Sequence, residues 1–239
     1  MFPNNWFSTH KDANIPKGAF FTYPMKVQSR QREINPDIIT EIGQNYKKNL
    51  TLKPDRKGKA LEGTGSLVID SRLKKIYCCL SERADFNTLI KFNMRLSKIA
   101  KEDYQLVSFV AKDAKGTKIY HTNVMLAILD KHAICCLDSV EDAHDRDRLQ
   151  KELSQGGREI INISLNEMGE MCGNMIQLRS EKSLPKGDMC VIMSERARKG
   201  LTKEHLSILD KHYNIVSSDI STIETIGGGS ARCMVAEIF

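Results

Sequence analysis

The chain has 239 residues, of which 41% are hydrophobic and 28% are charged. This size and balance are typical of a folded globular protein and exclude disordered and collagen-like chains. No stretch approaches 18 uncharged apolar residues, and the N-terminus lacks the basic-then-apolar layout of a secretory signal, so we expect no membrane partner. The net charge of +6 comes with short basic runs at 53–59 and 194–200 rather than one stripe, so we expect no nucleic-acid surface.

The chain contains an odd number of cysteines, with two adjacent pairs and no C-x-x-C motif. They are Cys78, Cys79, Cys135, Cys136, Cys172, Cys190 and Cys233. This pattern suits neither a disulfide framework nor a zinc site, so we expect a reducing, cytoplasmic setting with no metal and no cofactor. Adjacent residues of a strand point to opposite faces, so the two pairs predict strands that are buried on both sides.

Hydrophobic periodicity predicts a recurring order of elements along the chain. Residues 5–25 indicate a loose hairpin, and residues 30–46 indicate a helix. Residues 65–80 form two apolar runs around a polar turn, which is typical of a hairpin. Helical spacing follows over 83–100 and a strand over 104–111.

The same order returns twice more. Residues 123–140 predict a hairpin, 141–157 a helix closed by two glycines, and 158–165 a strand. The next hairpin, helix and strand are predicted at 174–195, 195–212 and 214–220.

The predicted hairpins begin at regular intervals. Their starts, at Asn5, Gly65, Asn123, Asn174 and Arg232, lie 60, 58, 51 and 58 residues apart. This order predicts an α/β fold of four ββαβ units in a single catalytic domain over 1–239, with Cys233 on the first strand of a fifth unit. Because no unit buries its own sheet, we expect the units to pack around a shared centre. We also expect the fold to be incomplete, with about one N-terminal unit preceding Met1; the alternative is a shorter, complete fold with an open end.

Each predicted unit begins with a polar corner, and quasi-symmetric units bring such corners together into one cavity. Three corner residues form a coherent set: Cys233 as a thiolate nucleophile, His121 as a general acid and base, and Glu62 as a hydrogen-bond acceptor. Taken singly, each of these residues is more often structural than catalytic. The glycines at 227–229 either let the backbone approach a ligand closely or form a surface turn.

The other histidines are weaker candidates for the site. We interpret His132, His144, His205 and His212 as solvated, in turns or on polar helix faces. His10 lies on the first predicted hairpin and reaches the cavity only if a turn interrupts the strand alternation.

Five motifs in this order carry a family resemblance. They are "FPNNW" (2–6), "EGTGSLVID" (62–70), "YHTNVMLAI" (120–128), "NMIQL" (174–178) and "ETIGGGSARCMVAEIF" (224–239). The set resembles the guanidino-group-modifying superfamily, or pentein fold, and most closely its citrulline-utilisation hydrolases and amidinotransferase-related proteins. The resemblance implies a five-fold pseudo-symmetric α/β propeller, whose members usually begin before the "FPNNW" position. By position it also implies that Cys233 is the nucleophile, His121 the family histidine and Glu62 the acidic residue of its E-G motif.

Two positions depart from the arginine-acting members, because Asn5 and Asn123 occur where those members carry Asp. Paired carboxylates grip a cationic guanidinium, whereas an asparagine amide offers a neutral ureido group a donor and an acceptor without charge. We therefore predict that Asn5, Asn123 and Gly229 bind a neutral, citrulline-like substrate. The alternative is that the two asparagines only stabilise their turns and that specificity lies elsewhere.

The sequence thus predicts a cysteine-dependent hydrolase that cleaves a C–N bond of a ureido or guanidino amino acid, in the first place citrulline, through a covalent thiol-linked intermediate. Within the same fold, the alternative is an arginine deiminase, a dihydrolase or an amidinotransferase. An inactive remnant without catalysis is the alternative of another class. The expected partner is a small-molecule amino acid, and oligomer formation is left open.

Overall fold

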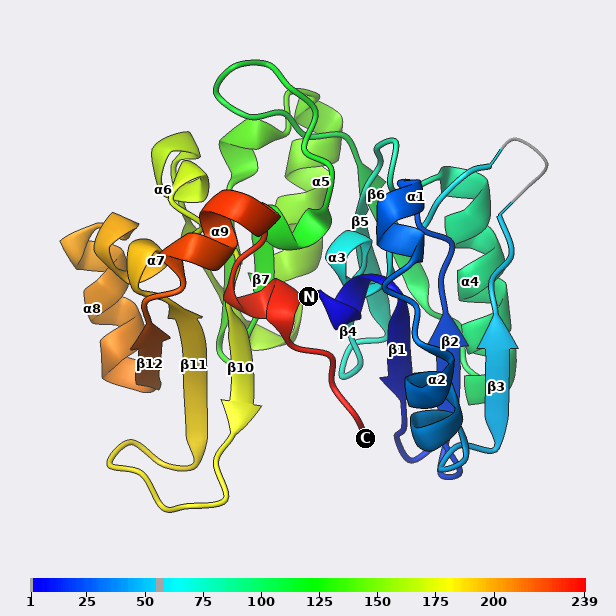
Figure 1. The fold of residues 1–239 in the computed structure, drawn as a ribbon. Coiled ribbons are helices and arrows are strands. Elements are labelled where there is room, and N and C mark those ends of the chain that lie inside the picture. Colours follow the sequence, from blue (N-terminus) through cyan, green and yellow to red (C-terminus); the bar gives the residue numbers. More distant parts are fainter. Residues whose placement is uncertain (1, 55–57) are drawn as a thin grey trace.

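The structure is a computed structural model that describes residues 2–54 and 58–239, so the centre of the basic run at 53–59 lies outside the described residues. The described chain forms four three-stranded sheets (Figure 1). The strands are β1 (Phe7–His10), β2 (Ala19–Thr22), β3 (Lys48–Thr51), β4 (Val68–Asp70), β5 (Lys75–Cys79), β6 (Gln105–Phe109), β7 (Leu126–Ile128), β8 (His132–Cys135), β9 (Glu159–Asn162), β10 (Ile176–Arg179), β11 (Met189–Ser194) and β12 (Asn214–Ser218). Among the described helices, none combines the length and the apolar character that crossing a membrane requires.

All four sheets share one topology. In each sheet the first two strands form an antiparallel hairpin, and the third strand pairs in parallel with the middle one. A parallel pair needs a crossover connection, and a helical segment makes it between the second and third strands of every sheet. This arrangement confirms the predicted ββαβ unit and its fourfold repetition.

The helices vary in length more than the strands do. They are α1 (Gln28–Gln31), α2 (Pro36–Gly43), α3 (Gly63–Ser66), α4 (Phe86–Ala100), α5 (Ala143–Ser154), α6 (Leu165–Gly169), α7 (Glu195–Gly200), α8 (Lys203–His212) and α9 (Ser221–Gly227), with 3-10 helices at Pro3–Asn5, Thr122–Val124, Leu137–Ser139, Gln155–Gly157 and Ala231–Met234. In α4, the Asp85 side chain caps the first turn by accepting a hydrogen bond from the Thr88 backbone N–H. Leu89, Phe92 and Leu96 recur at helical spacing and are fully buried against the sheet.

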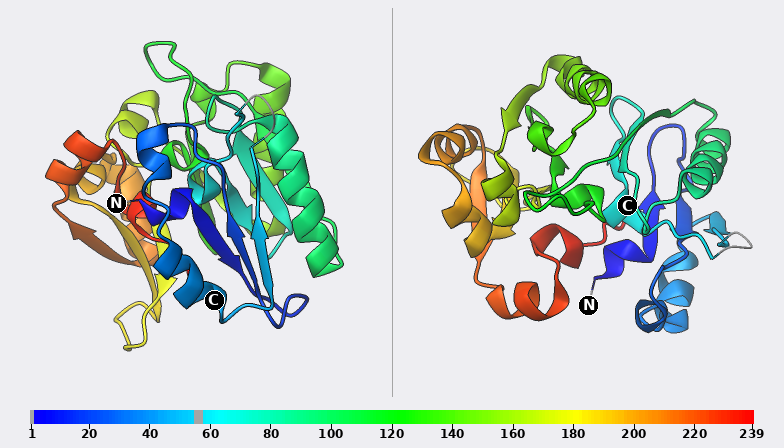
Figure 2. Two further views of the ribbon diagram at one scale, coloured as in Figure 1. Left: turned by 45° about the vertical axis from the view of Figure 1, so that its right-hand side comes forward. Right: turned by 90° about the horizontal axis from the view of Figure 1, so that it is seen from above.

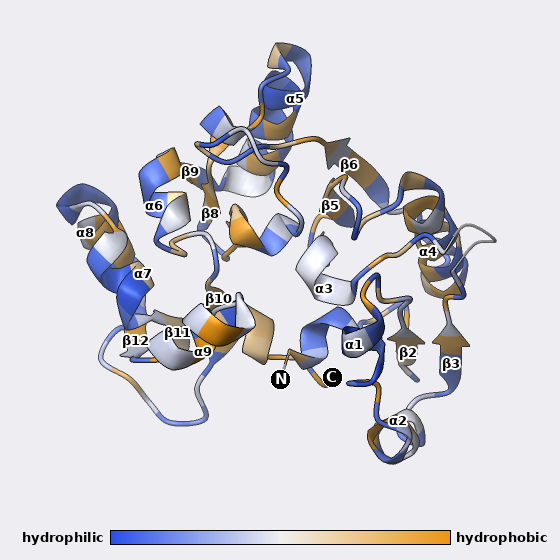
Figure 3. Cartoon of the chain, turned by 45° about the horizontal axis from the view of Figure 1, so that its top comes forward, coloured by the Kyte–Doolittle hydropathy of each residue, from blue (hydrophilic) through white to orange (hydrophobic). Residues whose placement is uncertain are grey.

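The four units surround a common centre, as the view from above shows (Figure 2). Hydrophilic residues predominate on the outer helices α5 and α8 (Figure 3). The segments that precede the hairpins meet at the centre, where the helical turn Pro3–Asn5 contacts α3 and Ala231–Met234, and α3 also contacts Thr122–Val124. The convergence of the polar corners is therefore present in the structure.

Buried side chains join neighbouring units. Arg158, which directly precedes β9, donates to the Asp70 carboxylate at the end of β4 over 2.5 Å, and both side chains are buried. Lys75 on β5 donates to Glu152 on α5, also over 2.5 Å. The adjacent cysteine pairs are buried as well, which confirms the prediction made from their spacing.

Two predicted helices are each divided in the structure. Residues 30–46 contain the end of α1 and all of α2, because Pro36 starts a new helix and restricts the residue before it. Residues 195–212 contain α7 and α8, and Thr202 caps the second of them by accepting from the His205 backbone N–H. The sequence analysis also missed α9.

The predicted strand at Cys233 is wrong. Cys233 lies in the 3-10 helix Ala231–Met234, and residues 235–239 are not in a strand, although the structure describes all of them. They follow the edge of β1, where Thr9 donates its hydroxyl to the Glu237 carbonyl and accepts from the Phe239 N–H. Hydrogen bonds to the Thr9 side chain thus take the place of backbone pairing between strands.

Candidate active site

A pocket of about 430 Å³ opens at the centre of the ring, where the corners of the units meet. Its lining comes from distant parts of the chain and is made of Phe2, Asn5, Val27, Ser29, Arg30, Arg83, Tyr120, His121, Gly227, Gly228, Gly229 and Cys233. The structure thus brings four of the six predicted site residues into one cavity lining. The other two predicted residues lie next to this lining: Glu62 contacts His121, and Asn123 contacts Cys233.

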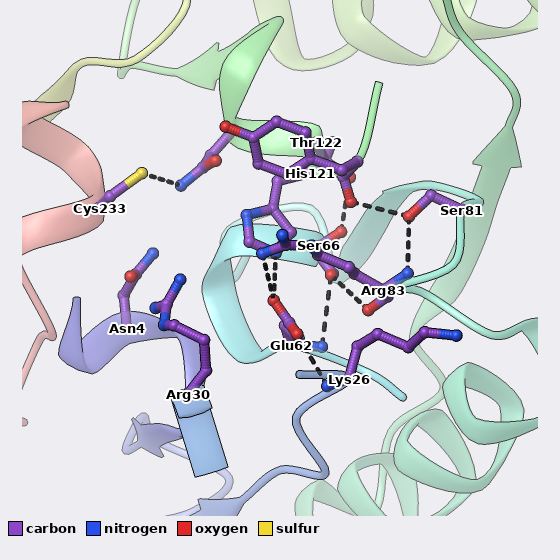
Figure 4. Close-up of polar contacts among 12 residues, drawn as sticks. Asn4, Lys26, Arg30, Glu62, Ser66, Ser81, Arg83, His121, Thr122 and Cys233 are labelled. Carbon is purple, nitrogen blue, oxygen red and sulfur yellow. Dashed lines mark hydrogen bonds and ion pairs between the residues drawn. The ribbon is translucent and has the colours of Figure 1, made fainter. Parts of the chain in front are cut away.

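Glu62 and His121 form a buried pair across two units. Glu62 precedes α3, and its carboxylate Oε2 lies 2.8 Å from Nε2 of His121, while Oε1 accepts from the Lys26 backbone N–H at 2.9 Å. A carboxylate only accepts hydrogen bonds, so Nε2 of His121 is the donor. Nδ1 of the neutral imidazole is then left as an acceptor on the side of the ring toward Cys233 (Figure 4).

The electrostatics of this pair favour an ionised Glu62 and a neutral His121 at neutral pH. Burial lowers the pKa of His121, the charges of Arg83 and Arg30 lower it further, and Glu62 opposes them, so that the pKa lies below its ordinary value. Burial alone raises the pKa of Glu62, but the hydrogen bonds from His121 and from the Lys26 N–H, with the charge of Arg83, bring it below its ordinary value. A neutral imidazole held by a carboxylate has the form of a general base.

Two asparagine amides surround the sulfur of Cys233. Nδ2 of Asn123 donates to Sγ at 3.3 Å, and Nδ2 of Asn174 donates to it at 3.2 Å. Asn174 follows the turn before β10; in the sequence it starts a predicted hairpin and the motif "NMIQL", but it had no assigned role. Cys233 is buried but lines the pocket, so its sulfur faces the cavity.

The glycines before Cys233 lie close to its side chain. Gly228 ends α9 in the left-handed conformation with φ of 70°, which glycine adopts at little cost. A Cβ on Gly229 would lie 3.0 Å from Phe2 and 3.1 Å from Cβ of Cys233. Of the two interpretations left open for 227–229, close approach of the backbone to a bound ligand fits this pocket lining better than a free surface turn.

Several buried amide atoms around the centre have no partner within the described part of the chain. They are both amide atoms of Asn4, Oδ1 of Asn5 and Oδ1 of Asn123. Buried polar groups are normally paired, and orphaned ones at a cavity point to a bound polar ligand or water. Asn4 lies between Cys233 and Arg30 (Figure 4), outside the residues that line the pocket, and it was not singled out from the sequence.

Arg30, Arg83 and Tyr120 are lining residues that the sequence analysis missed. The Arg83 guanidinium lies 5.0 Å above the Tyr120 ring and 3.4 Å from Oε2 of Glu62. Arg30 stacks on the Phe2 ring at 5.4 Å and pairs with Glu33. Tyr120 donates its hydroxyl to the Gly228 carbonyl at 2.7 Å. The position of Tyr120 directly before His121 was the one available signal, since neither arginine lies in a recognisable motif.

The histidine predictions need two corrections. His132 is buried rather than solvated, and its Nδ1 lies 2.9 Å from the Tyr213 hydroxyl. His205 is half-buried and pairs with Glu167. His10 bonds to Ser8 and lines a different, smaller cavity, so it does not reach the pocket of Cys233.

One group of possible metal ligands comes together in the described residues, at the start of α5. It consists of Asp142, His144 and Asp145, none of which lines the pocket. Asp142 caps the helix, and Asp145 pairs with Arg148, so these two carboxylates already have structural uses. Within the pocket lining, His121 and Cys233 are the side chains of metal-binding type.

Comparison with known proteins gives one family model, described as N,N dimethylarginine dimethylhydrolase, eukaryotic, that matches residues 1–239. No curated protein matched the sequence. Solved structures do match: the apo form of ArgZ, an arginine dihydrolase from cyanobacteria, is similar with a TM-score of 0.74 and 13% identity, covering 100% of the present chain and 33% of ArgZ. The chain therefore spans about a third of that relative.

Two further structures show the same likeness. The N-terminal domain of ArgZ bound to substrate has a TM-score of 0.70 and 13% identity, with coverage of 100% of the present chain and 76% of that domain. An adduct of a dimethylarginine dimethylaminohydrolase with S-methyl-L-thiocitrulline has a TM-score of 0.65 and 17% identity, with coverage of 98% and 74%. At these identities the likeness establishes the fold, which is that of the pentein superfamily.

The match over the whole sequence, the four ββαβ units around one centre and the shared fold agree with one another. The chain belongs to the family described as N,N dimethylarginine dimethylhydrolase, eukaryotic, and it has the pentein fold.

Proposed function

We propose that the chain is a thiol-dependent hydrolase of a C–N bond in a small amino acid with a ureido head, such as citrulline. The observation that carries this proposal is the composition of the pocket: a cysteine, a carboxylate-supported histidine and two arginines line or adjoin it, and no Asp or Glu occurs in the lining, all of which is described. A neutral head group fits such a lining better than a guanidinium, which requires carboxylates to offset its charge.

In the proposed mechanism Nδ1 of His121 takes the thiol proton of Cys233, and the thiolate so formed attacks the ureido carbon and forms an S–C bond. The C–N bond to the leaving nitrogen then breaks, and that nitrogen takes a proton from Nδ1 of His121. Nδ1, again free, accepts a proton from water as the water attacks the thiol-linked carbon and expels the thiolate. The carbamate released in this way decomposes, so that citrulline and water give ornithine, carbon dioxide and ammonia.

Arg30 and Arg83 are suited to binding the α-carboxylate, at the end of the substrate away from the ureido group. Arg30 and Arg83 are the cations of the lining, and an α-carboxylate at the pocket mouth would accept hydrogen bonds from one or both guanidinium groups. Among the unpaired amide atoms, Oδ1 of Asn5 belongs to a residue of the pocket lining and supplies an acceptor of no net charge for the ureido nitrogens, whereas Asn123 contacts Cys233 from outside that lining.

A guanidino substrate is the second candidate, because the family description names dimethylarginine and the similar ArgZ is called an arginine dihydrolase. A reaction intermediate covalently bound to the ArgZ N-terminal domain and the thiocitrulline adduct also support a covalent route in this fold. For this chain, the absence of a carboxylate from the described lining favours the ureido substrate.

The test is to incubate the purified chain separately with citrulline, arginine and dimethylarginine and to quantify ornithine, citrulline, ammonia and dimethylamine. We expect ornithine and ammonia from citrulline, retained in the Cys190→Ala control, whose cysteine lies on β11 outside the pocket, and lost in Cys233→Ala. Turnover that survives Cys233→Ala would refute thiol chemistry. Turnover of arginine or dimethylarginine without citrulline would refute the ureido assignment, and no turnover of any of the three would refute the proposal for this chain.

A further inference from the structure

The hydrogen bonding of Cys233 differs in kind from that of three other buried cysteines. In those three the sulfur donates to a backbone carbonyl: Cys79 to Ile119, Cys172 to Ala197 and Cys190 to Leu178. The Cys233 sulfur instead accepts two N–H bonds, from Asn123 and Asn174. A carbonyl acceptor holds a cysteine as the thiol, whereas amide donors favour its anion.

The orientation of the Asn174 amide is determined by its other contacts. Its Oδ1 accepts from the Arg232 backbone N–H at 3.0 Å, which a terminal NH₂ group in that position could not do. Its Nδ2 donates both to the Asn123 carbonyl at 2.9 Å and to Sγ of Cys233 at 3.2 Å. Asn174 is 1% exposed, so water does not compete for these bonds.

We propose that Asn174 is a further catalytic residue, which stabilises the thiolate form of Cys233 through its Nδ2–H. The inference rests on the proposed function, in which Cys233 is the nucleophile. Asn123 supplies the second donor to the sulfur, while the backbone of Arg232, the residue next to Cys233, holds the Asn174 amide in place. The donors come from the corners of units three and four, and the sulfur comes from the segment after unit four. The two hydrogen bonds to the sulfur therefore form only when the ring is assembled.

This arrangement favours the reactive anion without placing a cation against the sulfur. A hydrogen bond to a charged group is stronger than the same bond to a neutral partner. The bond therefore strengthens when the thiol ionises, and the general base does not need to hold the thiol proton throughout the reaction. Nδ1 of His121 can therefore pass the thiol proton on to the leaving nitrogen and then accept a proton from water.

The chain allows Cys233 to be followed selectively. Burial raises the pKa of Cys79 to about 11 and that of Cys172 to about 12, and it raises those of Cys78 and Cys135 still further. Iodoacetamide reacts with thiolates, so at neutral pH these four react slowly, whereas Cys233 opens into the pocket. Mass spectrometry of the peptide that contains Cys233 gives its alkylation rate directly.

The experiment compares the pH dependence of this rate in the wild type, Asn174→Leu and Asn93→Leu, without substrate. Leucine preserves the size of the side chain and removes the donor. We expect Asn174→Leu to raise the pH of half-maximal alkylation by about one to two units, which corresponds to a rate roughly 10 to 100 times lower at neutral pH. Asn93 on α4 bonds to the Tyr104 carbonyl and to Ser97 and does not line the pocket, so the Asn93→Leu profile should match that of the wild type.

An unchanged pH profile in a folded Asn174→Leu variant would overturn the proposal. If Asn174→Leu fails to fold, as judged by thermal melting followed by circular dichroism, Asn174→Asp replaces it. Aspartate keeps the shape and the acceptor for the Arg232 N–H, and it removes the donor while adding a negative charge, so the upward shift should be at least as large. Because alkylation is measured without turnover, this outcome is independent of whether citrulline is the substrate or whether Cys233→Ala abolishes activity.

Discussion

Oε2 of Glu62 lies 2.8 Å from Nε2 of His121, and neither side chain is more than 3% exposed. The two residues are 59 positions apart in the sequence and belong to the corners of different units. The contact fixes the imidazole with Nε2 as the donor, and it therefore decides which ring nitrogen can take part in chemistry. Four predictions follow from this site and from the units that carry it.

The first prediction concerns the pH dependence of kcat/KM. The pKa of His121 is held below its ordinary value, so its protonation should form an acidic limb below about pH 6.5. Glu62 raises this pKa, so Glu62→Gln should move the limb to lower pH and reduce kcat at least about a hundredfold, because the imidazole loses its support. Arg83 lowers the same pKa, so Arg83→Met should move the limb toward higher pH.

Opposite shifts of the two variants are the measurable signature, obtained from initial rates between pH 4.5 and 8 in buffers of constant ionic strength. Exposed Arg95 on α4 bonds to the Thr51 carbonyl and does not line the pocket, so Arg95→Met is a matched control that should leave the limb in place. If both active-site variants moved the limb in the same direction, His121 would not be the titrating group.

The second prediction concerns recognition of the substrate carboxylate. Arg30→Met should raise KM for citrulline about ten- to a hundredfold with a smaller change in kcat, because a charge-assisted hydrogen bond outside the reacting centre is removed. An analogue of citrulline without the α-carboxylate should be turned over poorly by the wild type and about equally poorly by the variant. If Arg30→Met reduced turnover of the analogue as much as turnover of citrulline, Arg30 would act by shaping the pocket and not by binding the carboxylate.

The third prediction concerns the backbone beside the nucleophile. A methyl group on Gly229 would lie 3.0 Å from Phe2 and 3.1 Å from Cβ of Cys233, closer than ordinary packing allows. Gly229→Ala should therefore displace one of these neighbours and lower kcat/KM about tenfold or more. Gly169, at the end of α6, has open space around the position of a Cβ, so Gly169→Ala should retain wild-type rates. Wild-type rates in Gly229→Ala would show that the pocket tolerates movement at this point.

The fourth prediction concerns the buried ion pair that joins units two and three. Arg158→Met leaves the Asp70 carboxylate without its cationic partner in the interior, so the free energy of unfolding should fall by about 3–5 kcal/mol. Combining Arg158→Met with Asp70→Asn removes the uncompensated charge and should restore part of the loss. Urea denaturation followed by circular dichroism measures both variants. A double variant no more stable than Arg158→Met would indicate that the charge of Asp70 is not the source of the cost.

The repetition of units was predictable because it follows from local sequence patterns. Apolar runs around polar turns and helical spacing each depend on neighbours within a few residues, so all four hairpins and the helices α4 and α5 were located from the sequence. The break between α7 and α8 was missed because the apolar spacing continues through it, and only the capping contact of Thr202 separates the two helices.

The site was predictable in part, for a related reason. Cys233, His121 and Glu62 occupy equivalent corners of repeating units, and the repeat alone indicated that these corners meet. Arg30 and Arg83 occupy no recognisable motif, Asn174 lies in "NMIQL" without an assigned role, and the contacts of these residues form across units. Their participation depends on packing between segments up to about 200 residues apart in the sequence, which local periodicity does not describe.

Local sequence patterns were sufficient for the ββαβ unit, for its recurrence and for the buried cysteine strands, because hydrogen bonding within a unit and alternation of side chains are short-range properties. The conformation around Cys233 was not a local property. The predicted strand became a 3-10 helix, and the sulfur came to accept two amide donors, because the Arg232 backbone bonds to Asn174 from another unit. Assembly of the ring supplied these partners and thereby the environment of the Cys233 sulfur.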